Sequence, residues 1–528
     1  MDRFMIVSTI LIGMIIFSGI GYFVFDFRTN RNKVITNGRV LLIIMLSAGM
    51  ALIGYLCMAI SNHYSIDSFN LVFDMGPYWH LQLGRYLNCG IILLAMKLGL
   101  NQVLQQQFFC FVWLAALIAV ISIVSIAISK YLQIQRTRTC VMIVLATSIA
   151  FVNVFMMEFV LFPEMMMVSA WGIISLGLSI YFALNVNMSM KSRALSVIYL
   201  WIALGNYQSY IGIFVSFVLI GNFLRWRENS VQCYKEMFLS LIYGGIVSAS
   251  NIILVKFLIN IDVITDSGRG TGLDLFTIKR NIIQLLKYQK PFWNNADGLL
   301  PFGVMPAIGI VLFGLLFYRL MYMKRWERSY VVISLCISYI LGFAPHIVES
   351  TILLSPRSNV AIWSFFSGIF IFIITLNKWE NIKKYRIITA LCLILLLGSS
   401  TFYMQDMAAN TQMVNAIDFT EADQICDRIK RYEINSGNTI TQIAIKNDSN
   451  VTIYPHISKY KNCELGARIL STPYSGYRLL GYMLRRPLKK IDMQKDIYQK
   501  FFEGKDWNCL NVDEQMVFER DTLYLMIY

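Results

Sequence analysis

Long apolar runs separated by short polar loops dominate the first 403 residues. A bilayer core about 30 Å thick is crossed by about 20 apolar residues in a helix. On this basis the runs predict twelve candidate spans, at 4–25, 40–60, 107–129, 140–157, 165–184, 194–204, 207–223, 237–258, 300–318, 330–345, 360–376 and 387–403. The sixth is short, so we expect it to form a broken pair with the seventh around Gly205 and Asn206. The predicted fold class is therefore a polytopic α-helical membrane protein with about 11–12 transmembrane helices.

The pattern changes after Tyr403. Residues 404–528 contain 16 Lys and Arg and 16 Asp and Glu. The periodicity predicts an amphipathic helix over 418–432 and strands over 439–445, 451–454 and 522–528. We therefore expect 1–403 to be the membrane domain and 404–528 to be a soluble α/β domain outside the membrane.

Loop charge sets the predicted orientation. The stretch 80–100 is too weakly apolar for a span, and we place the whole loop 61–106 outside, with helices at the interface. Lys and Arg residues then gather in six loops on the cytoplasmic face, as the positive-inside bias requires; these loops are 26–39, 130–138, 191–193, 225–236, 319–328 and 378–386. The first span is predicted to be an uncleaved anchor, with a cleaved signal peptide as the alternative.

Composition narrows the class of protein. The chain is 57% hydrophobic and only 15% charged, which excludes an ordinary soluble domain and a disordered chain. The net charge of +15 would suggest a nucleic-acid partner in a soluble protein, but here it lies in the cytoplasmic loops, so no nucleic acid is expected. Most cysteines are interpreted as buried apolar residues, and one disulfide is possible among Cys426, Cys463 and Cys509.

The first outer loop has the densest candidate chemistry. It carries Asp67, Asp74, His80 and Arg85 among aromatic residues. Acids and an arginine on interfacial helices suit a site where a lipid-borne substrate meets water. The alternative is ordinary loop charge with aromatic residues anchored at the interface.

Four further polar residues border the predicted spans. Glu158 and Glu164 flank Phe162-Pro163 at the end of the fourth span, and Glu158 has the more apolar setting. Tyr207 and Gln208 follow the short sixth span, where an amide and a phenol can hydrogen-bond a sugar. Solvated carboxylates and contacts between helices are the alternative interpretations.

Basic residues on the outer face are candidate phosphate ligands. Lys287 and Lys290 lie in the outer loop 259–299, and Arg357 is the basic residue of a late outer loop. Attraction to anionic lipid headgroups is the alternative. The glycine-rich run 267–272 has no following Lys-Ser/Thr, and the Cys and His spacings do not resemble a zinc site. A donor already across the membrane, carried by a lipid, fits these observations.

The motif Tyr64-Ser-Ile-Asp67-Ser-Phe, followed by Leu83-Gly84-Arg85-Tyr86-Leu87, resembles the first loop of the type II O-antigen glucosyltransferase-like family. The resemblance extends to the acid after the fourth span (Glu158 or Glu164), to Tyr207-Gln208, to Pro356-Arg357 and to the outer C-terminal domain. The family often has two adjacent acids in the first loop, whereas here Ser68 follows Asp67.

The resemblance implies a GT-C-type membrane glycosyltransferase. By the resemblance, such an enzyme transfers a hexose, expected to be glucose, from a polyprenyl-phosphate carrier to a surface polysaccharide or wall glycan, with inversion. It implies that the protein lies in a bacterial cytoplasmic membrane, with the lipid bilayer as a partner. It also implies that no metal or other cofactor is required, with a divalent metal as the open alternative. It also implies these roles: Asp67 as general base; Arg85, Arg357, Lys287 and Lys290 at the donor phosphate; and Asp74, His80, Glu158, Glu164, Tyr207 and Gln208 at the sugar or acceptor.

Two other functions compete with the transferase. A flippase of lipid-linked saccharides needs polar groups along a path to the inner face, and charges within the predicted spans are scarce. A non-catalytic scaffold would use the C-terminal domain to bind a partner.

Overall fold

The computed structural model describes residues 2–29, 37–73, 76–131, 137–185, 190–268, 274–375, 383–447, 453–454, 456–460 and 464–528. Eight helices within these ranges are long and apolar enough to span a membrane. They are α1 (Asp2–Thr29), α2 (Asn37–Ile60), α6 (Gln106–Ser129), α9 (Pro163–Ala183), α12 (Ser230–Asn260), α14 (Val304–Met321), α17 (Ile362–Thr375) together with the helical turn before it, as the segment Pro356–Thr375, and α18 (Lys383–Ser436). The chain is thus mostly helical, with the character of a multi-pass membrane protein.

Shorter helices complete the bundle. Four of them correspond to predicted spans or parts of spans: α7 (Thr137–Ser148), α10 (Met190–Leu204), α11 (Tyr210–Arg225) and α15 (Arg325–Leu341). The predicted break between the sixth and seventh spans lies where α10 ends at Leu204 and α11 begins at Tyr210. Because several segments fall below the length of a full span, the figure of 11–12 crossings stays a prediction.

The predicted span 140–157 is wrong as a single helix. The helix α7 ends at Ser148 and α8 (Val154–Leu161) begins afresh after a turn. The Asn153 side chain caps α8 by accepting hydrogen bonds from the backbone N–H groups of Phe155 and Met156 at 3.1 and 2.9 Å. Such a cap satisfies backbone donors at a helix start, so one polar residue divides an otherwise apolar run.

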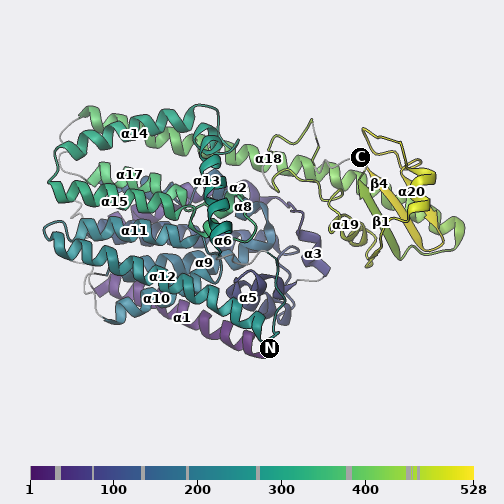
Figure 1. The fold of residues 1–528 in the computed structure, drawn as a ribbon, viewed down its shortest axis with the longest axis horizontal. Helices are drawn as coiled ribbons and strands as arrows, with labels where there is room; N and C mark the ends of the chain where they lie inside the picture. Colours follow the sequence, from purple (N-terminus) through teal and green to yellow (C-terminus); the bar gives the residue numbers. More distant parts are fainter. Residues whose placement is uncertain are drawn as a thin grey trace.

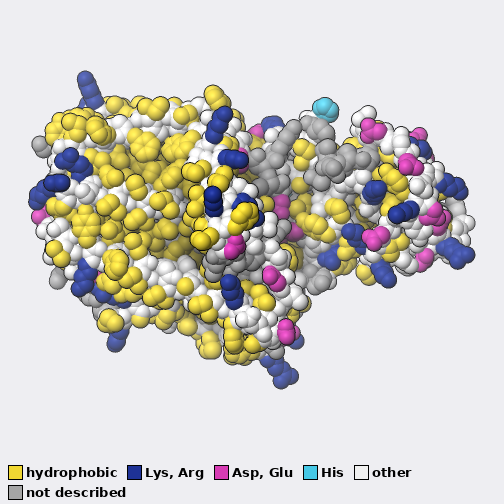
Figure 2. Space-filling model, viewed as in Figure 1, with side chains coloured by type: hydrophobic (Ala, Val, Ile, Leu, Met, Phe, Trp, Pro, Cys, Tyr) yellow, Lys and Arg dark blue, Asp and Glu magenta, His cyan; other side chains and the backbone are white. Residues whose placement is uncertain are grey.

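The bundle has enclosed and lipid-facing helices. Most of α6, α9 and α17 is buried, whereas α1, α2 and α12 leave most of their apolar surface exposed. Figure 2 shows this apolar surface as a broad area over the bundle. Exposed apolar area of this extent is unusual on a soluble monomer and fits contact with lipid tails.

The helix α18 leaves the bundle and continues into the C-terminal region, residues 404–528 (Figure 1). It passes through the boundary predicted after Tyr403 without a break. We call the end of the bundle from which α18 emerges the distal end. Short helices gather there together with the longer α13 (Leu275–Asn295). The short ones are α3 (Ser68–Phe73), α4 (Pro77–Gln82), α5 (Tyr86–Lys97), α8, α16 (Ala344–Ile347) and the 3₁₀ helix η2 (Pro356–Asn359).

The C-terminal region contains a four-stranded sheet in the order β2-β1-β4-β3. The strands are β1 (Gln442–Asn447), β2 (Lys489–Lys490), β3 (Met516–Glu519) and β4 (Thr522–Ile527), accompanied by α19 (Gly476–Met483) and α20 (Lys495–Phe501). The strand β1 pairs parallel with β2 and β4, and β3 pairs antiparallel with β4. The predictions for 418–432, 439–445 and 522–528 are confirmed in type.

Two smaller predictions fall partly outside the described residues. Of the predicted strand 451–454, residues 451 and 452 lie outside them, and Ile453 forms a single bridge with Ala467. Cys463 also lies outside, while Cys426 and Cys509 are both free thiols. A disulfide between Cys426 and Cys509 is therefore absent.

The first long loop is tied to both parts of the chain. The helix α5 packs against α1, α4 and α9, so most of it is buried in the bundle and not laid on its surface. The helix α3 packs against α19, and Phe69 enters the apolar core of the C-terminal region. The loop that carries Asp67 thus bridges the bundle and the C-terminal region.

Candidate functional site

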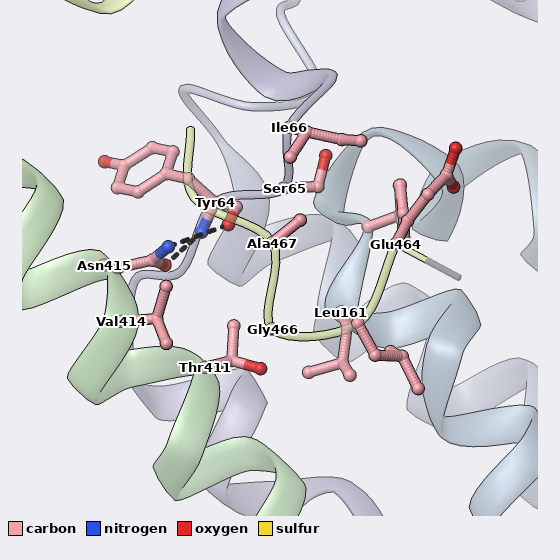
Figure 3. A pocket seen from close by; sticks show the side chains of 12 residues that line it. Tyr64, Ser65, Ile66, Leu161, Thr411, Val414, Asn415, Glu464, Gly466 and Ala467 are labelled. Carbon is pink, nitrogen blue, oxygen red and sulfur yellow. Dashed lines mark hydrogen bonds between the residues drawn. The ribbon is translucent and has the colours of Figure 1, made fainter. Parts of the chain in front are cut away.

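An open hollow of about 340 Å³, a volume that includes open solvent, lies at the distal end of the bundle (Figure 3). Two of its lining residues, Phe162 and Glu464, contact the predicted site residue Arg357. The walls of the hollow come from loop residues 64–66, the end of α8, α18 and residues 464–467. The Asn415 side chain on α18 fixes the loop, accepting from the Tyr64 N–H at 2.8 Å and donating to the Tyr64 carbonyl at 3.0 Å (Figure 3). Sequence segments hundreds of residues apart therefore meet at this point.

Asp67 lies beside a second, buried carboxylate. The Glu164 side chain accepts hydrogen bonds from the hydroxyls of Ser65 and Ser68 at 2.6 and 3.0 Å, and it interacts electrostatically with Asp67. The Asp67 N–H donates to the Ser65 hydroxyl at 3.0 Å, which fixes the turn. Asp67 is only partly buried, whereas Glu164 is buried. A fixed turn thus places a partly exposed carboxylate near a buried one.

The sequence at the α8–α9 junction explains the position of Glu164. Pro163 opens α9 at its first position, and Glu164 lies in the first turn. Proline fits this position because its missing N–H has no helical partner there, and a carboxylate is favoured by the helix dipole. Glu158 and Glu164, the two acids predicted near this turn, therefore have different surroundings: Glu164 contacts the Asp67 loop, and Glu158 has other partners.

Glu158 pairs with Arg357. The Arg357 backbone N–H donates to Glu158 Oε2 at 2.6 Å, and its Nη1 lies 3.2 Å from Glu158 Oε1. Its Nη2 donates to Glu464 Oε2 at 2.7 Å, and its guanidinium lies 4.2 Å from the centre of the Phe162 ring. Arginine stacks well on aromatic faces and binds carboxylate or phosphate oxygens with its planar fork. Since Phe162 and Glu164 flank Pro163, one tight turn joins the Arg357 cluster to the Asp67 cluster.

Arg85 belongs to a third group of residues. Its guanidinium lies 4.6 Å from the centre of the Tyr207 ring. Tyr207 interacts electrostatically with both Arg85 and Arg357, and also with Glu158 and Glu349. The Gln208 amide donates to the Leu83 carbonyl at 2.8 Å and so holds the turn before Arg85. Tyr207 therefore connects the two arginines, while Gln208 has a positioning contact.

Two histidines are buried near these groups. Burial, with a smaller effect of the Arg85 charge, lowers the pKa of His80 to about 3. Burial also lowers the pKa of His63, whose Nε2 lies 2.7 Å from the Val160 carbonyl. Both rings are therefore neutral near pH 7. His80 Nδ1 has no hydrogen-bond partner among the residues that the structure describes.

The remaining predicted residues are not brought into these contacts. Lys287 and Lys290 lie on the exposed face of α13, which runs steeply across the distal end of the bundle (Figure 1). Within the described residues, neither lysine has a hydrogen bond or ion pair to the arginine or carboxylate clusters. Asp74 lies outside the described residues. Their roles stay predictions.

Two acids escaped the sequence analysis. Glu464 belongs to the C-terminal region, 107 residues from its partner Arg357, so local spacing gave no signal. Glu349 lies in the same loop as Arg357 and 2.9 Å from His346 Nδ1, and its position in that loop was a usable signal. In the part of the chain that the structure describes, no three His, Cys, Asp or Glu residues are grouped to hold a metal ion.

The site contains the chemical groups that are needed to transfer a group from a phosphate to an acceptor hydroxyl. A partly exposed carboxylate can accept a proton, and the partly buried guanidinium groups of Arg85 and Arg357 can stabilise charge that develops on a leaving oxyanion.

Comparison with known proteins gives the family. The model of the family described as glucosyl transferase GtrII matches residues 56–374, well over half of the chain. The match includes the segments of Asp67, Arg85, Glu158, Glu164, Tyr207 and Arg357, and ends before α18 and the C-terminal region. A search of curated proteins found no match. From the family match, the chain belongs to the GtrII glucosyl transferase family.

Proposed function

We propose that this glycosyltransferase family member moves a hexose, assigned as glucose, from a polyprenyl-phosphate carrier to an extracytoplasmic surface polysaccharide or wall glycan. Family membership supports the transfer of glucose. In this proposal the protein lies in a bacterial cytoplasmic membrane with its distal end outside. The opposite end of the bundle carries mostly Lys and Arg among its charged side chains (Figure 2), and the positive-inside bias supports this orientation.

The proposed reaction inverts the anomeric carbon in one displacement. Asp67 accepts the proton of the acceptor hydroxyl while that oxygen bonds to C1 of the sugar. The bond between C1 and the phosphate oxygen breaks, and its electron pair leaves with the polyprenyl phosphate. Arg357 and Arg85 stabilise the leaving phosphate, so the reaction requires no metal in this proposal.

The remaining residues have binding roles in the proposal. Glu158, Tyr207 and His80 bind sugar or acceptor hydroxyls, Glu164 and Gln208 hold the site in shape, and Lys287 and Lys290 attract the lipid phosphate at the membrane surface.

One observation carries the proposal furthest. Arg357 Nη1 and Glu158 Oε1 are both buried, and neither has a hydrogen bond to a described residue although they are 3.2 Å apart. Buried polar atoms normally have hydrogen-bond partners. The two atoms form an ion pair, but each keeps unused hydrogen-bonding capacity. This fits a ligand that offers a phosphate oxygen to Arg357 and a hydroxyl to Glu158.

The test uses purified protein, a panel of polyprenyl-phosphate sugars and detection of the product by mass spectrometry. Replacing Asp67 with Asn (D67N) keeps the shape and removes the base, so transfer should fall by about 10²–10⁴-fold. The matched control is D513N, because Asp513 lies in the C-terminal region and pairs with Arg428 at 3.4 Å. Transfer by D67N at the rate of D513N would rule out Asp67 as the base.

A further inference from the structure

Arg357 lies between two carboxylates that come from different parts of the chain. Glu158 belongs to α8, inside the segment that matches the family model. Glu464 belongs to the C-terminal region, beyond the end of that segment. A residue outside the matched segment thus contacts the arginine that we assign to the donor phosphate.

The two carboxylates differ in how firmly they are held. The Glu158 side chain is fully buried and also accepts the Arg357 backbone N–H at 2.6 Å. The Glu464 side chain is 23% exposed, and within the described residues its hydrogen bond goes to Arg357 Nη2 alone. Figure 3 shows its carboxylate extending from segment 464–467 toward the α8–α9 side of the hollow. Glu464 can therefore leave Arg357 at lower cost than Glu158.

The charge at this site requires that one of the two carboxylates leave Arg357 when a phosphate binds. One guanidinium already faces two carboxylates, so adding a phosphate beside both would place three anions around one cation. Like charges in a poorly solvated site repel strongly. The Glu464 oxygen, 2.7 Å from Nη2, occupies a position that a phosphate oxygen would take in a bidentate complex. Glu464 thus stands in the place of the ligand.

We propose that Glu464 is a resident anion at the donor-phosphate site: it holds Arg357 in the empty enzyme and is exchanged for the phosphate when the donor binds. This inference rests on the proposed function, because it takes Arg357 as the phosphate ligand. Exchange also releases one contact of residues 464–467, which form a wall of the hollow. Donor binding is thereby linked to the shape of the hollow and to the C-terminal region.

The first test measures binding of polyprenyl monophosphate to full-length protein in neutral phosphatidylcholine nanodiscs. E464Q removes the competing charge and should bind the probe about threefold to tenfold more tightly than the unsubstituted protein. The matched control is E433Q, because Glu433 is another partly exposed acid of the C-terminal region that pairs with an arginine, Arg486. E433Q should leave the affinity unchanged. Equal or weaker binding by E464Q would overturn the exchange.

A second variant separates this inference from the proposed function. R357Q should lose most binding of polyprenyl monophosphate. If R357Q binds normally, the phosphate assignment in the proposed function fails, and the exchange fails with it. If R357Q loses binding while E464Q gains none, the exchange alone fails.

Hydrogen–deuterium exchange on the unsubstituted protein tests the proposal without a variant that could misfold. Amides of residues 464–467 should exchange faster when polyprenyl monophosphate is added at saturation, because the contact to Arg357 is then broken. Unchanged or slower exchange there would contradict the release of Glu464.

Discussion

Gly84 shapes the turn that presents Arg85 to Tyr207. Its φ is +74°, in the left-handed region that glycine adopts most readily. Its carbonyl accepts from the Asn251 amide at 3.0 Å. A Cβ at this position would lie 2.7 Å from Asn251 Oδ1 and 3.0 Å from Gln208 Nε2. Both backbone conformation and space therefore require glycine.

Replacing Gly84 with Ala should displace Arg85 and reduce transfer strongly, with a loss of stability of about 1–3 kcal/mol from strain. The measurements are transfer rate and thermal unfolding. The control is G99A: Gly99 also has positive φ, +68°, but open space surrounds its Cβ position. G99A should lose some stability and keep activity. Equal loss of activity in both variants would mean that the left-handed turn alone matters.

His80 makes stability depend on pH. Its pKa is about 3 in the folded protein and about 6.5 in an unfolded chain. Between these values the unfolded chain binds a proton that the folded protein does not, so stability falls as the pH drops below about 6.5. The largest effect between pH 7 and pH 5 is about 2 kcal/mol.

H80Q removes this titration. The thermal midpoint of the unsubstituted protein should fall more between pH 7 and pH 5 than that of H80Q. If the thermal midpoints of the two proteins change in parallel with pH, His80 takes up its proton in the folded protein and the expected pH dependence is wrong.

At the scale of elements, α3 couples the loop of Asp67 to the C-terminal region. Phe69 is fully buried there, with ring centres 5.3 Å from Tyr482 and 5.9 Å from Phe419. The Arg478 side chain also donates to the Asn70 carbonyl at 3.1 Å. The turn of Asp67, immediately before Phe69 and Asn70, is therefore fixed partly by residues outside the matched segment.

F69A should cost about 3–5 kcal/mol in packing of this region and reduce transfer. The control is F73A, because Phe73 lies on the same helix and is 42% exposed. F73A should change stability and activity little. If both variants retain full transfer, the anchoring of α3 does not position Asp67.

The elements that the sequence predicted well are those whose pattern is local. Runs of about 20 apolar residues gave α1, α2, α6 and α9 almost to their ends. The division between α7 and α8 depends on one capping residue, Asn153, inside an apolar run. A hydropathy average over about 20 residues does not detect a single polar residue. Hydropathy also does not predict that α18 continues past residue 403, because a helix can continue unbroken from an apolar stretch into a polar one.

At the scale of the whole molecule, the sequence predicted which residues share the distal end but not which of them touch. The loops of Asp67, Arg85 and Arg357 lie on one predicted face of the membrane, and that shared face is what the loop charges indicate. The pairing of Arg357 with Glu464 depends on how one segment of the C-terminal region lies against α18 and the distal end of the bundle, and no local pattern encodes a contact across 107 residues. The exposed position of Lys287 and Lys290 depends likewise on the rotation of α13.

The unbroken course of α18 has a mechanical consequence. At 1.5 Å per residue, its 54 residues extend about 80 Å, of which about 30 Å suffice to cross the hydrocarbon core. About 50 Å of stiff lever then stands beyond it, and a tilt of about 5° at the bilayer sweeps its tip by about 4 Å. A small tilt of the bundle is thus amplified at the sheet, so the membrane-spanning helices and the C-terminal sheet move together.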